Sequence, residues 1–145
     1  MRYVALVALL TGGVVSHEPA PSLGLARLES ADVVFTFRVA NGYHVQANPA
    51  AAEFLVPTSL RLRTACGVKA GPPVYPAPLS FRLEGADQDL AVWNGRFQVA
   101  VPLRVGRFAP RGECLLHGTL AYQACDLQRC LAPTSLEVVL PIRIR

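Results

Sequence analysis

The sequence predicts an all-β protein, folded as a single immunoglobulin-like β-sandwich. Three observations lead to this prediction. The chain has 145 residues, which suits one hydrophobic core. Its apolar side chains, 52% of the total with tyrosine included, recur mainly at every second position, as in strands with one buried face. Its 12 prolines and 11 glycines are spread along the chain, which argues against a helical bundle. A small barrel is the alternative architecture with the same pattern.

The amino-terminal segment resembles a secretory leader. It has an early positive charge at Arg2, then an apolar stretch, and small side chains that suit cleavage near Ser16. A buried first strand is the alternative interpretation. A leader would place the protein outside the cytosol, where cysteines can pair. No stretch reaches the roughly 18 apolar residues of a membrane span. The predicted division is a signal peptide over 1–16, a flexible arm over 17–22 and one domain over 23–145.

Alternation between apolar and polar residues predicts the strands in order along the chain. The clearest stretches are 33–39, 60–62, 97–103, 120–124 and 136–142. Asn94-Gly95 lies between two further apolar runs, and this pair favours a two-residue hairpin turn. Pro102 inside a predicted strand indicates an edge strand or a bulge. A single helical turn is expected at 49–54.

Two cysteines close together form the strongest chemical signal. Cys125 and Cys130 bracket four residues directly after a predicted strand, so a turn would allow a short-loop disulfide. Closing so short a loop gains little stability, which suits a bond that is made and broken. Arg129 favours the thiolate of Cys130, whereas Asp126 disfavours that of Cys125. Cys130 is therefore the better nucleophile. The alternative is a purely structural disulfide in a secreted sandwich.

The remaining cysteines, Cys66 and Cys114, lie at predicted strand ends. Pairing them would close a long loop, which is worth about 4 kcal/mol in the chain-entropy model. We favour this structural bridge, although four cysteines allow three connectivities and a second redox pair stays open.

Other chemistries find little support in the sequence. The cysteines with His44 and His117 lack the two short paired spacings of a structural zinc site, and the one methionine, Met1, argues against a copper carrier. Hydrolase, phosphate-loop and zinc-protease motifs are absent from the sequence. Arginines at alternate strand positions, with a net charge of +4, are typical of a solvated face and not of a nucleic-acid site. We therefore expect a monomer without metal, cofactor or nucleic acid.

Four sequence blocks together resemble a known family. The cysteine block contains Tyr-Gln-x-Cys, followed by Cys-x-x-Pro at the second cysteine. With the other three blocks it is similar to the amino-terminal periplasmic domain of the thiol:disulfide interchange protein DsbD. The resemblance extends from about residue 33 to residue 140. The four blocks are 41–49, 56–60, 74–78 and 122–133.

The resemblance implies an immunoglobulin-like domain with one redox-active pair, matched here by Cys125 and Cys130. Such a domain takes electrons from a thioredoxin-like donor fed by a membrane domain. It passes them to oxidised periplasmic proteins, such as disulfide isomerases and the thioredoxins of cytochrome c maturation. The second cysteine, matched by Cys130, forms the mixed disulfide. The expected activity is periplasmic thiol–disulfide oxidoreduction, and the alternative is a non-catalytic binding module with two structural disulfides.

The resemblance also implies neighbours for the pair. A loop carrying an aromatic residue shields the two sulfurs in the family, and Phe81 is the candidate for that ring. The block from 41 to 49 supplies aromatic residues near the pair. The expected shielding or tuning residues are Phe81, Tyr43, His44, Tyr122, Asp126 and Arg129.

Three features depart from the family pattern. This chain ends at Arg145 without the membrane and thioredoxin domains of the best-known members, so the donor is a separate protein or the chain is a fragment. The gap between Cys125 and Cys130 is one residue shorter. Cys66 and Cys114 are additional.

Overall fold

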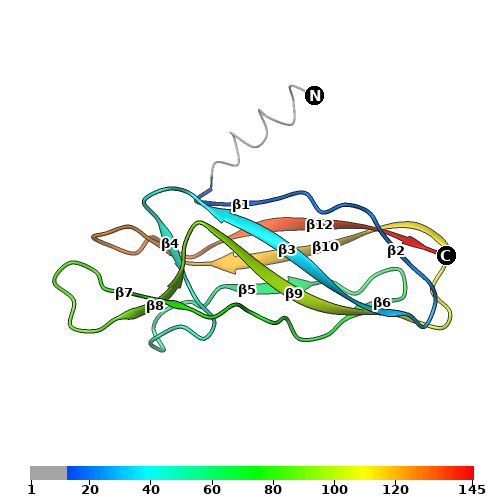
Figure 1. The fold of residues 1–145 in the computed structure, drawn as a ribbon, viewed down its shortest axis with the longest axis horizontal. Helices are drawn as coiled ribbons and strands as arrows, with labels where there is room; N and C mark the ends of the chain where they lie inside the picture. The colour runs from blue at the N-terminus through cyan, green and yellow to red at the C-terminus, as the bar shows by residue number, and fades with distance from the viewer. Residues whose placement is uncertain (1–12) are drawn as a thin grey trace, which may run out of the picture.

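The computed structural model describes residues 13–145, which form strands joined by turns and loops without a helix in that range (Figure 1). The predicted all-β class is confirmed. The twelve strands are β1 (Val15–His17), β2 (Leu23–Leu25), β3 (Ser30–Val39), β4 (His44–Gln46), β5 (Ser59–Leu62), β6 (Val68–Ala70), β7 (Leu79–Phe81), β8 (Leu90–Trp93), β9 (Arg96–Val105), β10 (Gly112–Tyr122), β11 (Ala124–Cys125) and β12 (Thr134–Ile144).

Three four-stranded sheets organise these strands. The first has the order β1-β3-β9-β6 and the second the order β2-β12-β10-β5. Their inward-facing side chains belong to one core cluster, which makes the two sheets a sandwich. The third sheet, β11-β4-β8-β7, lies at one end of the molecule (Figure 1). It brings the end of β10, through β11, beside two strands from the middle of the chain.

The core follows the alternation that the sequence shows. Along β3, Val33, Phe35, Phe37 and Val39 are buried and alternate with more exposed residues. β9 pairs with β3 antiparallel over nine residues and buries every second side chain in the same way. Burying each side chain of this size stabilises the fold by about 1.5–3 kcal/mol relative to exposure. The predicted sandwich rests on these two long strands and on β10 with β12.

The turn at Asn94-Gly95 is a correction to the predicted hairpin. β8 pairs with β4 and β7, whereas β9 pairs with β3 and β6, so the two strands flanking the turn belong to different sheets. Gly95 has φ of 59°, as the turn chemistry requires, and its carbonyl accepts a hydrogen bond from the Val39 amide at 2.7 Å. The turn therefore connects a strand of the third sheet, β8, to a strand of the first sheet, β9.

Pro102 lies in an internal strand and not in an edge strand, and a bulge occurs on the β6 side of β9, where Ala70 pairs with Leu103 and Val74 with Ala100. Pro102 pairs with Asp32 in an uninterrupted register between β3 and β9. Its carbonyl accepts a hydrogen bond from the Gly71 amide on the opposite side of β9, at 2.8 Å. The N and C=O of one strand residue point the same way, so the missing N–H faces the end of β6 and costs no bond to β3.

The loop between β4 and β5 contains only one tight turn, closed by a hydrogen bond from the Leu55 amide to the Ala52 carbonyl at 3.1 Å. The helical turn expected at 49–54 is thus reduced to a turn at its end. Phe54 stands at this turn with 84% of its surface exposed. The loop borders the third sheet and contributes to the site described below.

The predicted leader falls mostly on residues 1–12, outside the described range, and stays a prediction. Its last described residues enter β1, which pairs antiparallel with β3, and Val15 is buried against the core. In the predicted arm, His17 ends β1 and the Glu18 amide bonds to the Thr36 carbonyl at 2.9 Å. Within residues 13–145, no helix is long and apolar enough to cross a membrane.

Candidate functional site: a disulfide at the end of the sandwich

Two disulfides join the four cysteines, Cys66 to Cys114 and Cys125 to Cys130. This is the connectivity that the sequence favours. Cys66 lies two residues before the start of β6 and Cys114 lies in β10, so the first bond links the two sheets of the sandwich. Cys125 ends β11 in the third sheet, and the second bond therefore lies at the other end of the molecule (Figure 1).

The loop from Cys125 to Cys130 is closed by its own backbone and by Asp126. The Asp126 carboxylate accepts hydrogen bonds from the amides of Gln128 at 2.8 Å and Arg129 at 2.9 Å. The Asp126 amide donates to the Arg129 carbonyl at 2.9 Å. These bonds turn the chain back, so that the two cysteine Cα atoms lie 3.9 Å apart. The bond from Gln128, followed by that from Arg129, lowers the pKa of Asp126.

The two sulfur-bearing residues differ in access to solvent. Cys125 is 0% exposed, whereas Cys130 is partly exposed and lines a surface groove. Gln46 on β4 reinforces the difference, because its amide nitrogen lies 3.2 Å from Sγ of Cys125 and 3.9 Å from Sγ of Cys130. A partner sulfur can therefore approach Cys130, while Cys125 faces a buried hydrogen-bond donor.

Gln46 is fixed by the backbone on both sides. Its amide donates to the Gln123 carbonyl at 3.1 Å, and its carbonyl accepts from the amide and hydroxyl of Thr58. Its side chain is fully buried, and Oε1 has no hydrogen-bond partner among the described residues. Sequence reasoning missed Gln46, because a polar residue beside Val45 in a short strand is expected to face solvent. Its position within the resemblance block was the available signal.

His44 and Phe81 form an aromatic pair beside Cys125. His44 pairs with Cys125 across β4 and β11, and its ring centroid lies 3.9 Å from that of Phe81 on β7. Burial lowers the pKa of His44, and the nearby Asp126 carboxylate opposes this shift. The structure thus places Phe81 on the histidine that flanks Cys125. Nε2 of His44 is buried and has no hydrogen-bond partner among residues 13–145.

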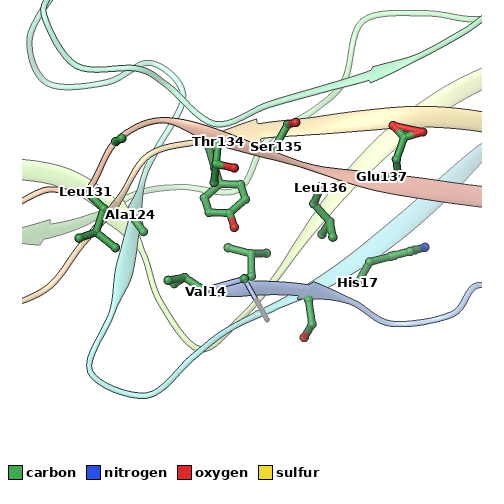
Figure 2. A pocket seen from close by; sticks show the side chains of 13 residues that line it. Val14, His17, Ala124, Leu131, Thr134, Ser135, Leu136 and Glu137 are labelled. Atoms are coloured by element: carbon green, nitrogen blue, oxygen red, sulfur yellow. The ribbon is translucent and has the colours of Figure 1, made fainter. Parts of the chain in front are cut away.

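Of the other residues predicted to lie near the cysteine pair, one lies in the cysteine loop and two lie in or against the main core. Arg129 is exposed in the cysteine loop next to Cys130. Tyr43 is half-buried against the main core, and Tyr122 is buried in that core. Tyr122 lines a different and larger cavity, of about 750 Å³, between β1 and the first residues of β12. Figure 2 shows that cavity with Val14, His17 and Leu136 on its walls. No cysteine lines it, so the site is assigned to the groove at Cys130.

The groove at Cys130 has a volume of about 510 Å³. Its walls come from the loop between β4 and β5 and from the hairpin of β7 and β8. Gln123 secures the first wall, because Oε1 accepts from the Val56 amide at 2.9 Å while Nε2 donates to the Leu131 carbonyl at 3.3 Å. The lining residues are Ala51, Ala52, Phe54, Leu55, Leu83, Ala86, Asp87, Gln88, Asp89, Leu90, Gln123 and Cys130.

The side chains of residues 13–145 include no group of three or more His, Cys, Asp or Glu that could hold a metal ion. The described site places one cysteine at the surface and one buried beside an amide donor.

No protein-family model matches the chain, and no curated protein matches it. Among solved structures, the N-terminal domain of DsbD from Neisseria meningitidis in the reduced form is 19% identical, with 79% of each chain covered and a TM-score of 0.48. The N-terminal periplasmic domain of ScsB from Proteus mirabilis is 12% identical, with a TM-score of 0.53 over 87% of this chain and 44% of that chain.

The likeness to the ScsB domain concerns the fold, because the sequence identity is low. It confirms the architecture that the sequence resemblance implied. The chain spans less than half the length of that ScsB chain. The all-β chain, with a disulfide at one end of its sandwich, thus has the fold of the N-terminal periplasmic domain of ScsB.

Proposed function

We propose that this protein exchanges thiols and disulfides through Cys125 and Cys130, as a relay between a thioredoxin-like donor and oxidised envelope proteins. The observation that supports this proposal is the asymmetry of one short disulfide. Sγ of Cys125 is buried beside the Gln46 amide, whereas Cys130 opens onto a groove. A bond that served only as a structural link would need neither the groove nor the asymmetry.

In the forward step, the Cys130 thiolate attacks one sulfur of a partner disulfide. A Cys130–partner bond forms, the partner's S–S bond breaks, and the second partner sulfur leaves as a thiolate that takes a proton from water. Cys125 then loses its proton to solvent and attacks Sγ of Cys130, which releases the second partner thiol. The domain is oxidised by two electrons and the partner is reduced by two.

Re-reduction reverses these steps. A donor thiolate reaches Sγ of Cys130, because that residue is the exposed one, and Cys125 becomes the leaving group. The Gln46 amide, 3.2 Å from Sγ of Cys125, donates a hydrogen bond to the developing negative charge. Arg129 next to Cys130 favours its thiolate in the reduced protein.

The cellular setting belongs to the same proposal. The ScsB domain with this fold is described as periplasmic, and we propose a periplasmic or other envelope location for this chain. There a thioredoxin-like protein would reduce it, and oxidised thiol–disulfide proteins, including those of cytochrome c maturation, would be its acceptors. The chemistry requires no cofactor.

Single-cysteine variants test the proposal. Cys130→Ala should abolish reaction of the reduced protein with 2-hydroxyethyl disulfide, because the exposed nucleophile is lost. Cys125→Ala should still attack and should accumulate the mixed disulfide, seen as added mass by mass spectrometry. Reaction at the normal rate in the Cys130→Ala variant would contradict the assignment.

A redox titration separates the relay from a binding module with two structural disulfides. A structural bridge is expected below about −300 mV, and a relay disulfide clearly above that value. The Cys125–Cys130 potential, measured with glutathione or dithiothreitol buffers and thiol alkylation, therefore decides between the two functions.

A further inference from the structure

The groove beside Cys130 is open, and its lining combines apolar side chains with Asp87 and Asp89. We propose that it is the docking site of a redox partner whose reactive cysteine is flanked by an apolar side chain and by lysine or arginine. This inference rests on the proposed function and adds the chemistry of the partner to it.

The apolar part of the groove is left uncovered by the chain itself. Phe54 projects from the first wall with most of its surface exposed, and Leu83 and Leu90 contribute to the second. A partner that covers Phe54 would remove this apolar surface from water, which favours binding. A partner residue of leucine or phenylalanine size fits this role, since the groove measures about 510 Å³.

Charge identifies the partner more closely. Three segments surround the groove and the disulfide: residues 47–58, 79–93 and 124–131. They hold five acidic and two basic side chains, a net charge of −3 in a chain whose total is +4. The acidic residues are Glu53, Glu84, Asp87, Asp89 and Asp126, and the basic ones are Arg82 and Arg129.

The carboxylates around the groove differ in whether a basic side chain already pairs with them. Asp89 forms an ion pair with Arg82 at 2.8 Å. Glu53, Glu84 and Asp87 are exposed, and among the described residues none of them forms an ion pair. Asp87 lines the groove itself, and the Glu84 amide bonds to the Leu127 carbonyl of the cysteine loop at 3.3 Å. Unpaired negative charge therefore lies on the same side as the exposed cysteine.

This distribution favours one kind of occupant. A basic partner is attracted to the groove, and such steering raises association rates at low ionic strength. An anionic thiol such as glutathione, or the acidic end of a second copy of this chain, is repelled. The predicted recognition pattern is thus an apolar side chain in the groove with positive charges on its rim.

Charged model disulfides test this inference. The probes are the disulfide-linked dimers of acetyl-Lys-Leu-Cys-Lys-amide and acetyl-Glu-Leu-Cys-Glu-amide, with 2-hydroxyethyl disulfide as the neutral probe. Rates with protein reduced at Cys125–Cys130 and intact at Cys66–Cys114 are each divided by the rate of the same probe with 2-mercaptoethanol, which removes intrinsic reactivity. At low salt the cationic probe should react on the order of tenfold faster than the anionic one. Salt at 0.5 M should remove most of the preference.

Variants assign the preference to the groove. The double variant Glu84→Gln/Asp87→Asn should lower the cationic-to-anionic ratio about threefold. Asp32→Asn is the matched control, because Asp32 is exposed on β3, away from the groove. Phe54→Ala should slow the leucine-containing cationic probe relative to its glycine analogue, without loss of folding, since Phe54 is largely exposed.

Each outcome has one meaning. Equal corrected rates for the two charged probes, or a ratio that Glu84→Gln/Asp87→Asn leaves unchanged, would overturn the docking inference while the neutral reaction upholds the proposed function. Absence of reaction with 2-hydroxyethyl disulfide would overturn the proposed function itself, and the docking inference with it.

Discussion

The two disulfides of this protein differ in the length of the loop that each one closes and in their position in the fold. Cys66 and Cys114 are separated by 48 positions, and their Cα atoms lie 6.5 Å apart across the two sheets. Cys125 and Cys130 are separated by five positions within one end loop. The first bond connects parts of the chain that would otherwise move apart on unfolding. The second connects residues that the loop already brings together.

Their surroundings differ in the same sense. Beside Cys66, Gly67 is packed so closely against Ala109 that an added Cβ would come within 2.8 Å of its backbone. Cys130, by contrast, opens onto a groove, and its partner Cys125 has a buried amide donor at 3.2 Å. The bond packed between the sheets and the bond that opens onto a groove thus lie at opposite ends of one sandwich.

Removing the inter-sheet bond gives the largest expected effect on stability. The double variant Cys66→Ala/Cys114→Ala should lose about 4 kcal/mol of unfolding free energy, because the closed loop is long. Denaturant unfolding without reductant measures this loss. Exchange with 2-hydroxyethyl disulfide should stay unchanged under conditions where the variant is folded. A large fall in exchange would instead give this bond a redox role.

Removing the end-loop bond should cost less stability than removing the inter-sheet bond and should abolish exchange. The double variant Cys125→Ala/Cys130→Ala should lose only about 2 kcal/mol, because the loop it closes is short. It should lose all exchange. The same unfolding and exchange measurements apply, and the comparison fails if this variant proves as destabilised as the first.

Sequence reasoning reached the sandwich because its signal is local. The alternation along 33–39 and 97–103 is a property of each strand alone, and both strands bury the expected faces. The pairing of strands, by contrast, depends on contacts between segments that are distant in sequence. The Asn94-Gly95 pair satisfies the local needs of a turn, yet the neighbouring sheets determine that β8 and β9 separate there.

The candidate site shows the same limit. The spacing of Cys125 and Cys130 pointed to the disulfide, and the family resemblance pointed to His44 and Phe81. Gln46 and the groove walls were not foreseen, because they come from segments 35 or more residues away in sequence and meet only in the third sheet and its loops. Tyr122 belongs to the same resemblance block as the two cysteines, and strand alternation places its side chain in the core.

Gln46 offers a finer test of the reactive end. In a Cys130→Ala background, Gln46→Leu should raise the pKa of the Cys125 thiol by about one unit, since a hydrogen bond to the thiolate is lost. The pH dependence of Cys125 alkylation reports this value. Gln98→Leu is the matched control, because its amide bonds to Thr36 on the exposed face of β9. Equal pKa values in the two variants would show that the amide does not act on the sulfur.

The smallest expected effect concerns His44, which flanks the Cys125–Cys130 disulfide. Burial lowers its pKa in the folded protein below the ordinary value of 6.5. As the pH falls from 7 to 5, the unfolded chain therefore gains a proton at this position that the folded protein does not, and the free energy of unfolding decreases. Glu18, Asp89, Asp126 and Glu137 do not obscure this window, because the fold lowers their pKa values and their contributions are lost only at more acidic pH.

Two variants attribute the pH dependence to one end of the molecule. His44→Gln should reduce the difference in unfolding free energy between pH 7 and pH 5, measured by denaturant titration of the oxidised protein. Gln98→Leu should not, because Gln98 has no titratable side chain and bonds to Thr36 on the exposed face of β9. If the two variants change this difference equally, the pH dependence of the unfolding free energy does not come from the buried His44. Both substitutions leave the cysteines intact, so the result bears on the environment of the disulfide and not on its chemistry.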